Sequence, residues 1–201
     1  MSRTALAALA LLAAVSSPCL ANSLIGAGPR SGIAKSRMYA TPTGEWNKLS
    51  LQEGKNVEVW TLDGDALNKV TFFGGVPEGR PLLRERDKKN RPLPKVTANM
   101  LVTDIPTLLE TTYRSQFAVN QMTVDTQVPA VLDGHNGIRF TYSFTKADDE
   151  VRRKGEAVGA MINGQLYLVS YEAPAIYFFD KDVERFSPSY SPDLYFRERW
   201  C

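Results

Sequence analysis

The segment VRRKGEAVGAMINGQLYLVSYEA, residues 151–173, contains the strongest structural signal in this sequence. Its Asn163-Gly164 pair is typical of a two-residue hairpin turn, because both central positions of a type I′ turn have positive φ. This turn also sets the register of the two strands. The predicted pairs are Ile162–Gln165, Met161–Leu166, Ala160–Tyr167, Gly159–Leu168 and Val158–Val169.

Both faces of this predicted hairpin are apolar. On one face the small residues Ala157 and Gly159 oppose Leu166 and Leu168, which leaves room for a closely packed helix. The other face is also apolar and includes Val158, Ala160, Tyr167, Val169 and Tyr171. We therefore expect the sheet to be covered on both sides.

Two other segments have the apolar spacing of amphipathic helices. Residues 104–118 begin with Asp104 as a suitable N-cap and place Pro106 in the first turn, where its missing N–H costs nothing. The apolar stripe there is Leu108, Leu109, Tyr113 and Phe117. Residues 175–186 follow Pro174 and carry the stripe Ile176, Phe179, Val183 and Phe186. We therefore interpret the aromatic run Tyr177, Phe178 and Phe179 as part of the core.

Shorter runs with β-type composition occur before and after the first helix. They cover residues 46–51, 57–62, 67–73, 122–128 and 138–144. The Asp63-Gly64 pair between the second and third runs is a turn signal, so an antiparallel meander is expected there.

This order of elements resembles the PsbP-like fold, whose members include small bacterial envelope proteins and lipoproteins of the DcrB type. The stretches that carry the resemblance are DIPTLLETTYRSQF (104–117), GIRFTYSF (137–144), GEAVGAMINGQLYLVSYEAP (155–174) and FFDKDVERF (178–186). The resemblance implies an α+β fold in a single domain, with an antiparallel sheet covered by helices on its faces as an α/β/α sandwich. It provides no site motif, so no functional residue is carried over from the family.

The first 21 residues have the features of a secretory signal peptide. Arg3 precedes an apolar run over residues 5–15, and small residues stand before a predicted cleavage after Ala21. A run of about 11 residues is too short for a membrane span, which needs roughly 20. We therefore expect export to the periplasm, with no transmembrane span in the mature chain. A second interpretation is that Cys19 is acylated, which would attach the protein to the membrane, although Pro18 precedes it in place of the usual small residue.

The remaining chain is expected to contain one domain. Residues 22–38, rich in Gly and Ser, are interpreted as a flexible lead-in, residues 39–186 as a single α+β domain, and residues 187–201 as a loosely ordered tail. Cys201 is then the sole cysteine of the mature chain, which excludes an intramolecular disulfide. It is either an exposed thiol for intermolecular pairing or a terminal residue without a role.

Charge is nearly balanced over the chain but concentrated in one segment. After loss of Arg3, 23 basic residues remain against 22 acidic ones, a formal net charge of +1 that does not suggest nucleic-acid binding. Within a Gly- and Pro-rich segment, residues 84–91 (RERDKKNR) contain five basic and two acidic side chains. The basic residues are Arg84, Arg86, Lys88, Lys89 and Arg91. This segment is either a solvated loop or a docking loop for an acidic partner or an anionic surface.

Motifs for catalysis and for cofactors are missing from the sequence. His135 is the only histidine, and its DGHNG context indicates a turn. The nucleophile motif of hydrolases, the spaced ligands of zinc and calcium sites, and the glycine motifs of nucleotide sites are not found. We therefore predict no catalytic residue, no metal site and no cofactor.

Two functional hypotheses follow. The first is a non-enzymatic envelope protein that binds a protein or ligand through the basic segment and the sheet edge, with an unknown envelope protein or an anionic surface as its partner. The alternative is an unrecognised hydrolase or small-molecule enzyme that uses carboxylates or tyrosines near the sheet. A deep pocket with convergent ionisable groups would favour the alternative.

Overall fold

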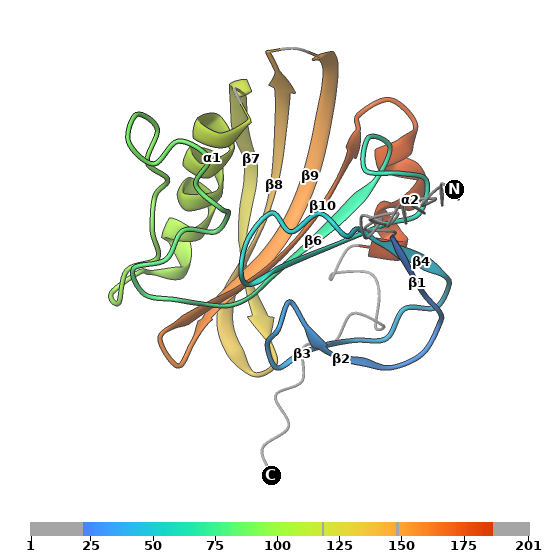
Figure 1. The fold of residues 1–201 in the computed structure, drawn as a ribbon, viewed down its shortest axis with the longest axis horizontal. Coiled ribbons are helices and arrows are strands. Elements are labelled where there is room, and N and C mark those ends of the chain that lie inside the picture. Colours follow the sequence, from blue (N-terminus) through green and yellow to red (C-terminus); the bar gives the residue numbers. More distant parts are fainter. Residues whose placement is uncertain (1–21, 118, 148, 187–201) are drawn as a thin grey trace, which may run out of the picture.

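The computed structural model describes residues 22–117, 119–147 and 149–186 (Figure 1). The predicted signal peptide (1–21) with Cys19, and the predicted tail (187–201) with Cys201, lie outside the described residues. The described chain forms these strands: β1 Ser23–Ile25, β2 Arg30–Ile33, β3 Met38–Ala40, β4 Trp46–Lys48, β5 Val57–Thr61, β6 Lys69–Pro77, β7 Val119–Leu132, β8 His135–Lys146, β9 Asp149–Ile162 and β10 Gln165–Pro174. Its helical segments are η1 Val102–Asp104, α1 Ile105–Gln116 and α2 Phe178–Phe186.

Eight of these strands form one antiparallel sheet. Their order is β1-β4-β5-β6-β10-β9-β8-β7, and β2 and β3 pair separately as a small hairpin. The predicted register of the β9–β10 hairpin is confirmed, with Met161 opposite Leu166 and Gly159 opposite Leu168. Asn163 and Gly164 have φ of 51° and 73°, as a type I′ turn requires. The hairpin therefore forms the centre of the sheet.

The predicted α/β/α sandwich is wrong. The described chain is mainly a large eight-stranded antiparallel sheet, and its two short helices do not cover the faces. Strands β7 and β9 have 14 residues each, which at about 3.3 Å per residue extend about 46 Å. The 12 residues of α1 extend only about 18 Å at about 1.5 Å per residue. Short helices cannot seal strands of this length, so other segments share the task.

The core has two parts, one on each face of the sheet. On the first face, α1 packs with Leu82, Leu83, Leu93 and Val96, which come from the irregular segment before it. On the second face, the β2–β3 hairpin contributes Ile33 and Met38, and α2 contributes Phe179. Figure 1 shows α1 and α2 on opposite sides of the sheet, with β2 and β3 away from both helices. Non-helical chain thus covers much of each face.

Helix α1 begins where the sequence predicts, but its cap differs. Asp104 occupies the N-cap position without making a side-chain cap hydrogen bond. Its Oδ2 instead accepts the N–H of Leu101 at 2.9 Å, which closes the preceding turn η1. The buried face of the helix includes Leu108, Leu109 and Tyr113, as the spacing indicates. The close approach is also confirmed, because a Cβ on Gly159 would lie 3.3 Å from Cγ2 of Ile105.

The aromatic run near α2 is only partly buried. Phe179 is 9% exposed and stacks on Tyr171 with ring centroids 5.5 Å apart, so its assignment to the core is confirmed. The helix begins at Phe178, however, which leaves Ile176 86% and Tyr177 65% exposed. The left-handed Tyr177 (φ 69°) separates these two residues from the helical stripe. The prediction that Ile176 belongs to that stripe is therefore wrong.

Residues 22–38 differ from the predicted lead-in. They contain β1 and β2, and they reach β3 at Met38. Ile33 and Ala34 are buried against the second face of the sheet. The segment also makes a specific bond, because the N–H of Ala34 donates to Oε2 of Glu58 at 3.0 Å.

Among residues 22–117, 119–147 and 149–186, no helix has the length and apolar character needed to cross a membrane.

Candidate functional site

The predicted basic segment is a folded loop with a closed base. Gly79 N–H donates to the carbonyl of Val96 at 2.9 Å, and Val96 N–H donates to the carbonyl of Arg80 at 3.0 Å. Pro81 and Lys95 form a bridge between the two arms. Leu82, Leu83 and Leu93 are 2–4% exposed and anchor the arms in the core beside α1. The loop is therefore held at a fixed place on the molecule.

The tip of this loop, residues 84–91, has its own hydrogen bonds. Arg84 N–H donates to the carbonyl of Glu53 at 2.6 Å, and the Gln116 side chain of α1 donates to the carbonyl of Arg84 at 3.1 Å. Asp87 Oδ1 accepts the N–H of Asn90 at 3.1 Å. Hydrogen bonds from the Asn90 side chain and backbone hold the pKa of Asp87 below its ordinary value, so this turn is stable when Asp87 is ionised.

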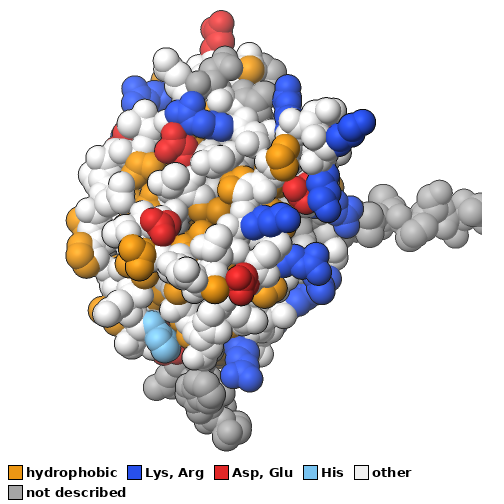
Figure 2. All heavy atoms as spheres, turned by 90° about the vertical axis from the view of Figure 1, so that its left-hand side faces the viewer, with side chains coloured by type: hydrophobic (Ala, Val, Ile, Leu, Met, Phe, Trp, Pro, Cys, Tyr) orange, Lys and Arg blue, Asp and Glu red, His pale blue; other side chains and the backbone are white. Residues whose placement is uncertain are grey.

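The tip carries an excess of positive charge. Its five basic side chains are all exposed, and none has an ion pair with another residue of the described ranges: Arg84, Arg86, Lys88, Lys89 and Arg91. The two acidic side chains have local partners, because Glu85 accepts the N–H of Leu93 and Asp87 bonds Asn90. Figure 2 looks onto the side where α1 and this segment lie, and Lys and Arg side chains gather along one edge of it. We call residues 84–91 the basic loop.

A second group of charged residues lies buried between the sheet and α1. Lys69 of β6 and Glu172 of β10 are cross-strand partners, and Lys69 Nζ lies 2.8 Å from Glu172 Oε1. The Glu172 side chain is 2% exposed and that of Lys69 is 11% exposed. The hydroxyl of Tyr113 in α1 donates to the other carboxylate oxygen of Glu172 at 2.8 Å. The carboxylate is thus shared by a strand lysine and a helix tyrosine.

Other buried polar groups surround this ion pair. Arg153 of β9 is 5% exposed and donates to the carbonyl of Ala66 at 2.7 Å. The hydroxyls of Thr71, Tyr142 and Ser170 are buried without a hydrogen-bond partner among the described residues. A site with this many polar groups is suited to ordered water.

The pKa directions in this group indicate a structural ion pair. Burial alone would raise the pKa of Glu172, but the charge of Lys69 and the hydrogen bonds from Lys69 and Tyr113 together outweigh it, so the pKa is lowered. Burial would lower the pKa of Lys69, but the charges of Glu172 and Glu53 and the hydrogen bond to Glu172 together leave that pKa raised. Burial, with the charge of Glu172, raises the pKa of Tyr113 well above its ordinary value. General acid–base catalysis needs a pKa near the working pH. All three pKa values are instead shifted away from neutral pH.

Because of this ion pair, we expect the free energy of unfolding to be highest at intermediate pH and to fall at both acidic and basic pH. A lowered folded-state pKa means that the stability from Glu172 is present above its ordinary pKa of 4.5 and is lost as the pH falls below it. The raised pKa of Lys69 means that its contribution is present below its ordinary 10.5 and is lost as the pH rises through the higher folded value. Urea unfolding followed by tryptophan fluorescence across the pH range will test this. The double variant K69M/E172Q should lose less stability in acid than the wild type, and equal losses would contradict the assignment.

His135, the only histidine of the sequence, was the other residue considered for a catalytic or metal site. His135 is the first residue of β8, paired with Leu132, and does not lie in the turn that the sequence indicates. The turn itself contains Asp133 and Gly134, both with positive φ. Among the described residues, no group of three or more His, Cys, Asp or Glu side chains could hold a metal ion.

Sequence reasoning identified the basic loop and missed the buried ion pair. A signal for the pair was present, because Glu172 continues the alternation of Leu166 and Leu168 into the core-facing side of an apolar strand. A carboxylate at such a position requires a partner. The sequence could not identify that partner, because Lys69 lies far from Glu172 in the chain.

No protein-family model matches this sequence, and no curated protein matches it. The geometry of the chain itself is therefore the basis for assigning a function.

Proposed function

We propose that this protein is an exported, non-enzymatic envelope protein that binds an acidic partner protein through the basic loop. The observation that carries the proposal is the set of five exposed cations on an anchored loop tip. Export is supported by the leader-like composition of residues 1–21. It remains compatible with either a periplasmic protein or one that is acylated at Cys19.

The structure of the loop suits recognition by charge. Its backbone is fixed at the base and at the tip, so little conformational entropy is lost when a partner binds. Arg84, Arg86 and Arg91 supply planar guanidinium groups that match carboxylates in a bidentate manner. The apolar residues of the segment, Leu82 and Leu93, are buried and are used for anchoring. The tip has no apolar side chain that could insert into a lipid bilayer. We therefore infer that it binds an acidic protein surface in preference to a bilayer.

The enzymatic alternative receives less support. Tyr113, Tyr142 and Glu172 are the residue types that it requires, and they do meet beside the sheet. The lowered pKa of Glu172 and the raised pKa of both tyrosines place these groups in fixed protonation states at neutral pH. Such groups hold charge in place and do not exchange protons with a substrate.

Neutralisation of the loop tests the proposed function. Two binding partners are used: acidic proteins identified by crosslinking in envelope preparations, and immobilised polyglutamate. The variant R84Q/R86Q/K88Q/K89Q should bind both about tenfold or more weakly than the wild type, because complementary charges speed association. Added salt should weaken wild-type binding in the same way. Binding constants from surface plasmon resonance are the measurement.

A matched control removes the same charge elsewhere. The variant R30Q/R152Q/K154Q/K181Q changes four other exposed cations and should bind as the wild type does. Equal loss in both variants would mean that total charge, and not the loop, determines binding. Strong binding of the wild type to phosphatidylglycerol vesicles, with none to polyglutamate, would contradict the choice of an acidic protein.

A further inference from the structure

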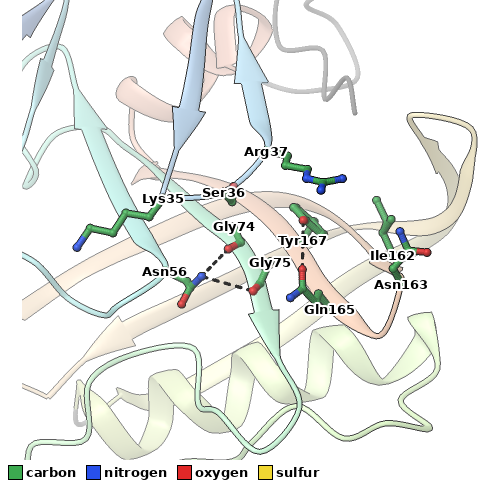
Figure 3. A pocket seen from close by; sticks show the side chains of 10 residues that line it. All are labelled: Lys35, Ser36, Arg37, Asn56, Gly74, Gly75, Ile162, Asn163, Gln165 and Tyr167. Carbon is green, nitrogen blue, oxygen red and sulfur yellow. Dashed lines mark hydrogen bonds between the residues drawn. The ribbon is translucent and has the colours of Figure 1, made fainter. Parts of the chain in front are cut away.

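A polar cleft lies where two turns of the chain meet strand β6. It has a volume of about 740 Å³ and opens between the β2–β3 turn, the middle of β6 and the β9–β10 turn (Figure 3). Its lining residues are Lys35, Ser36, Arg37, Asn56, Gly74, Gly75, Ile162, Asn163, Gln165 and Tyr167. None of these ten is acidic, and two are basic. The cleft is distinct from the basic loop in both its residues and its elements.

A bulge in β6 forms the floor of the cleft. Phe73 pairs with Leu168 and Val76 pairs with Leu166, so Tyr167 faces both Gly74 and Gly75. A Cβ on Gly75 would lie 3.0 Å from the Tyr167 hydroxyl and 3.1 Å from Oε1 of Gln165. Gly75 also has a φ of 62°, which disfavours other residues. The lack of a side chain at Gly74 allows Ser36 of the β2–β3 turn to pack against β6, and Gly75 leaves space beside Tyr167 and Gln165.

The rim of the cleft is a strained turn that carries the two cations. Ala34 and Lys35 have φ of 53° and 56°, which is unfavourable for residues other than glycine. The turn is held by Glu58, which accepts the N–H of Ala34, and by Ser36 Oγ, which donates to the carbonyl of Ile33 at 2.7 Å. Backbone strain of this kind persists where surrounding contacts enforce it, and it is common in binding sites. Here it places Lys35 and Arg37 on either side of Ser36, with their charged ends directed to opposite sides (Figure 3).

Polar groups on the walls are held in fixed positions. The amide of Asn56 donates to the carbonyls of Gly74 at 2.9 Å and Gly75 at 3.4 Å. The Tyr167 hydroxyl donates to Oε1 of Gln165 at 3.4 Å. These groups offer hydrogen bonds to the uncharged part of a ligand, while the rim offers positive charge. Clefts that bind small molecules typically have volumes of about 300–1,000 Å³.

We propose that this cleft binds a small organic anion that carries carboxylate or phosphate groups at two sides. Lys35 holds the charged oxygens on one side and Arg37 those on the other, and Asn56, Gln165 and Tyr167 hydrogen-bond the remainder of the molecule. This site is independent of the basic loop, so the two proposals can fail separately.

Amide shifts in NMR spectra of the full chain provide the test, with citrate and inorganic phosphate as probes. Saturable shifts are expected at Lys35, Gly74, Gly75 and Asn163, and citrate should bind more tightly than phosphate. The variant K35Q should weaken binding severalfold, and K35Q/R37Q about tenfold or more, because a hydrogen bond to a charged group is lost with each cation.

Two controls separate this site from other anion binding. The exposed Lys95 lies at the base of the basic loop, and K95Q should bind citrate as the wild type does. The loop variant R84Q/R86Q/K88Q/K89Q should also retain citrate binding at the cleft. The proposal is overturned if neither probe gives saturable shifts at Gly74 and Gly75. It is equally overturned if K95Q reduces binding as much as K35Q, or if K35Q and K35Q/R37Q bind like the wild type.

Discussion

Replacing Glu172 with glutamine is expected to lower the free energy of unfolding by about 3–5 kcal/mol. Glutamine has the shape of glutamate and can still accept the hydrogen bond of Tyr113, so the change removes little besides the charge. Lys69 is then left almost buried without a counter-charge, 2.8 Å from a neutral group. Urea unfolding at neutral pH, followed by circular dichroism, measures the loss.

Two controls isolate the cause of this loss. The variant K69M/E172Q removes the unpaired cation and should recover much of the stability, because a buried ion pair can often be replaced by uncharged groups. E110Q breaks the surface pair of Glu110 with Arg114, which has a similar distance of 2.9 Å but side chains that are 29% and 45% exposed. It should cost less than about 1 kcal/mol. Equal losses in E110Q and E172Q would show that burial of the pair has no energetic consequence.

Replacing Leu109 with alanine is the second large effect that we expect, at about 2–5 kcal/mol. Leu109 is fully buried between α1 and the first face of the sheet, in the same cluster as Phe140 and Leu168. The side chains around Leu109 come from α1, the sheet and the segment before the helix, and such packed neighbours relax only partly into the cavity that the substitution leaves. The result is measured by the same unfolding experiment.

A matched change on the exposed side of α1 provides the comparison. Thr111 is exposed, and alanine has a higher helix propensity, so T111A should change stability by no more than about 0.5 kcal/mol. If L109A were equally mild, α1 would contribute little to the core of this face, and the sheet and the segment before the helix would account for it.

Local patterns predicted the hairpin and the first helix well. Asn163-Gly164 determines its turn through the φ values of two residues, so the register of β9 and β10 followed directly. The stripe of α1 depends on spacing within one helix and was also correct. The second helix was predicted from residue 175, three residues before it begins at Phe178. The apolar spacing includes Ile176, but the left-handed φ of Tyr177 keeps that residue outside the helix.

The sites divide in the same way. Arg84 and its neighbours could be identified because a charge cluster between prolines and glycines is contiguous in the sequence. The cleft could not, since Lys35 and Arg37 come from a segment that was interpreted as a flexible lead-in. Gly74 and Gly75 were interpreted as the start of a loop, whereas β6 continues through them to Pro77.

Turn residues, hydrophobic spacing and charge clusters are visible in the amino-acid order because they act between residues a few positions apart. The extent of the sheet, the failure of two short helices to cover it, and the pairing of Lys69 with Glu172 arise only when distant segments meet. These contacts are favourable because water is excluded between side chains that are far apart in the chain. Such exclusion depends on the whole packed arrangement. It brings Ser36 against Gly74 and holds the basic loop beside α1.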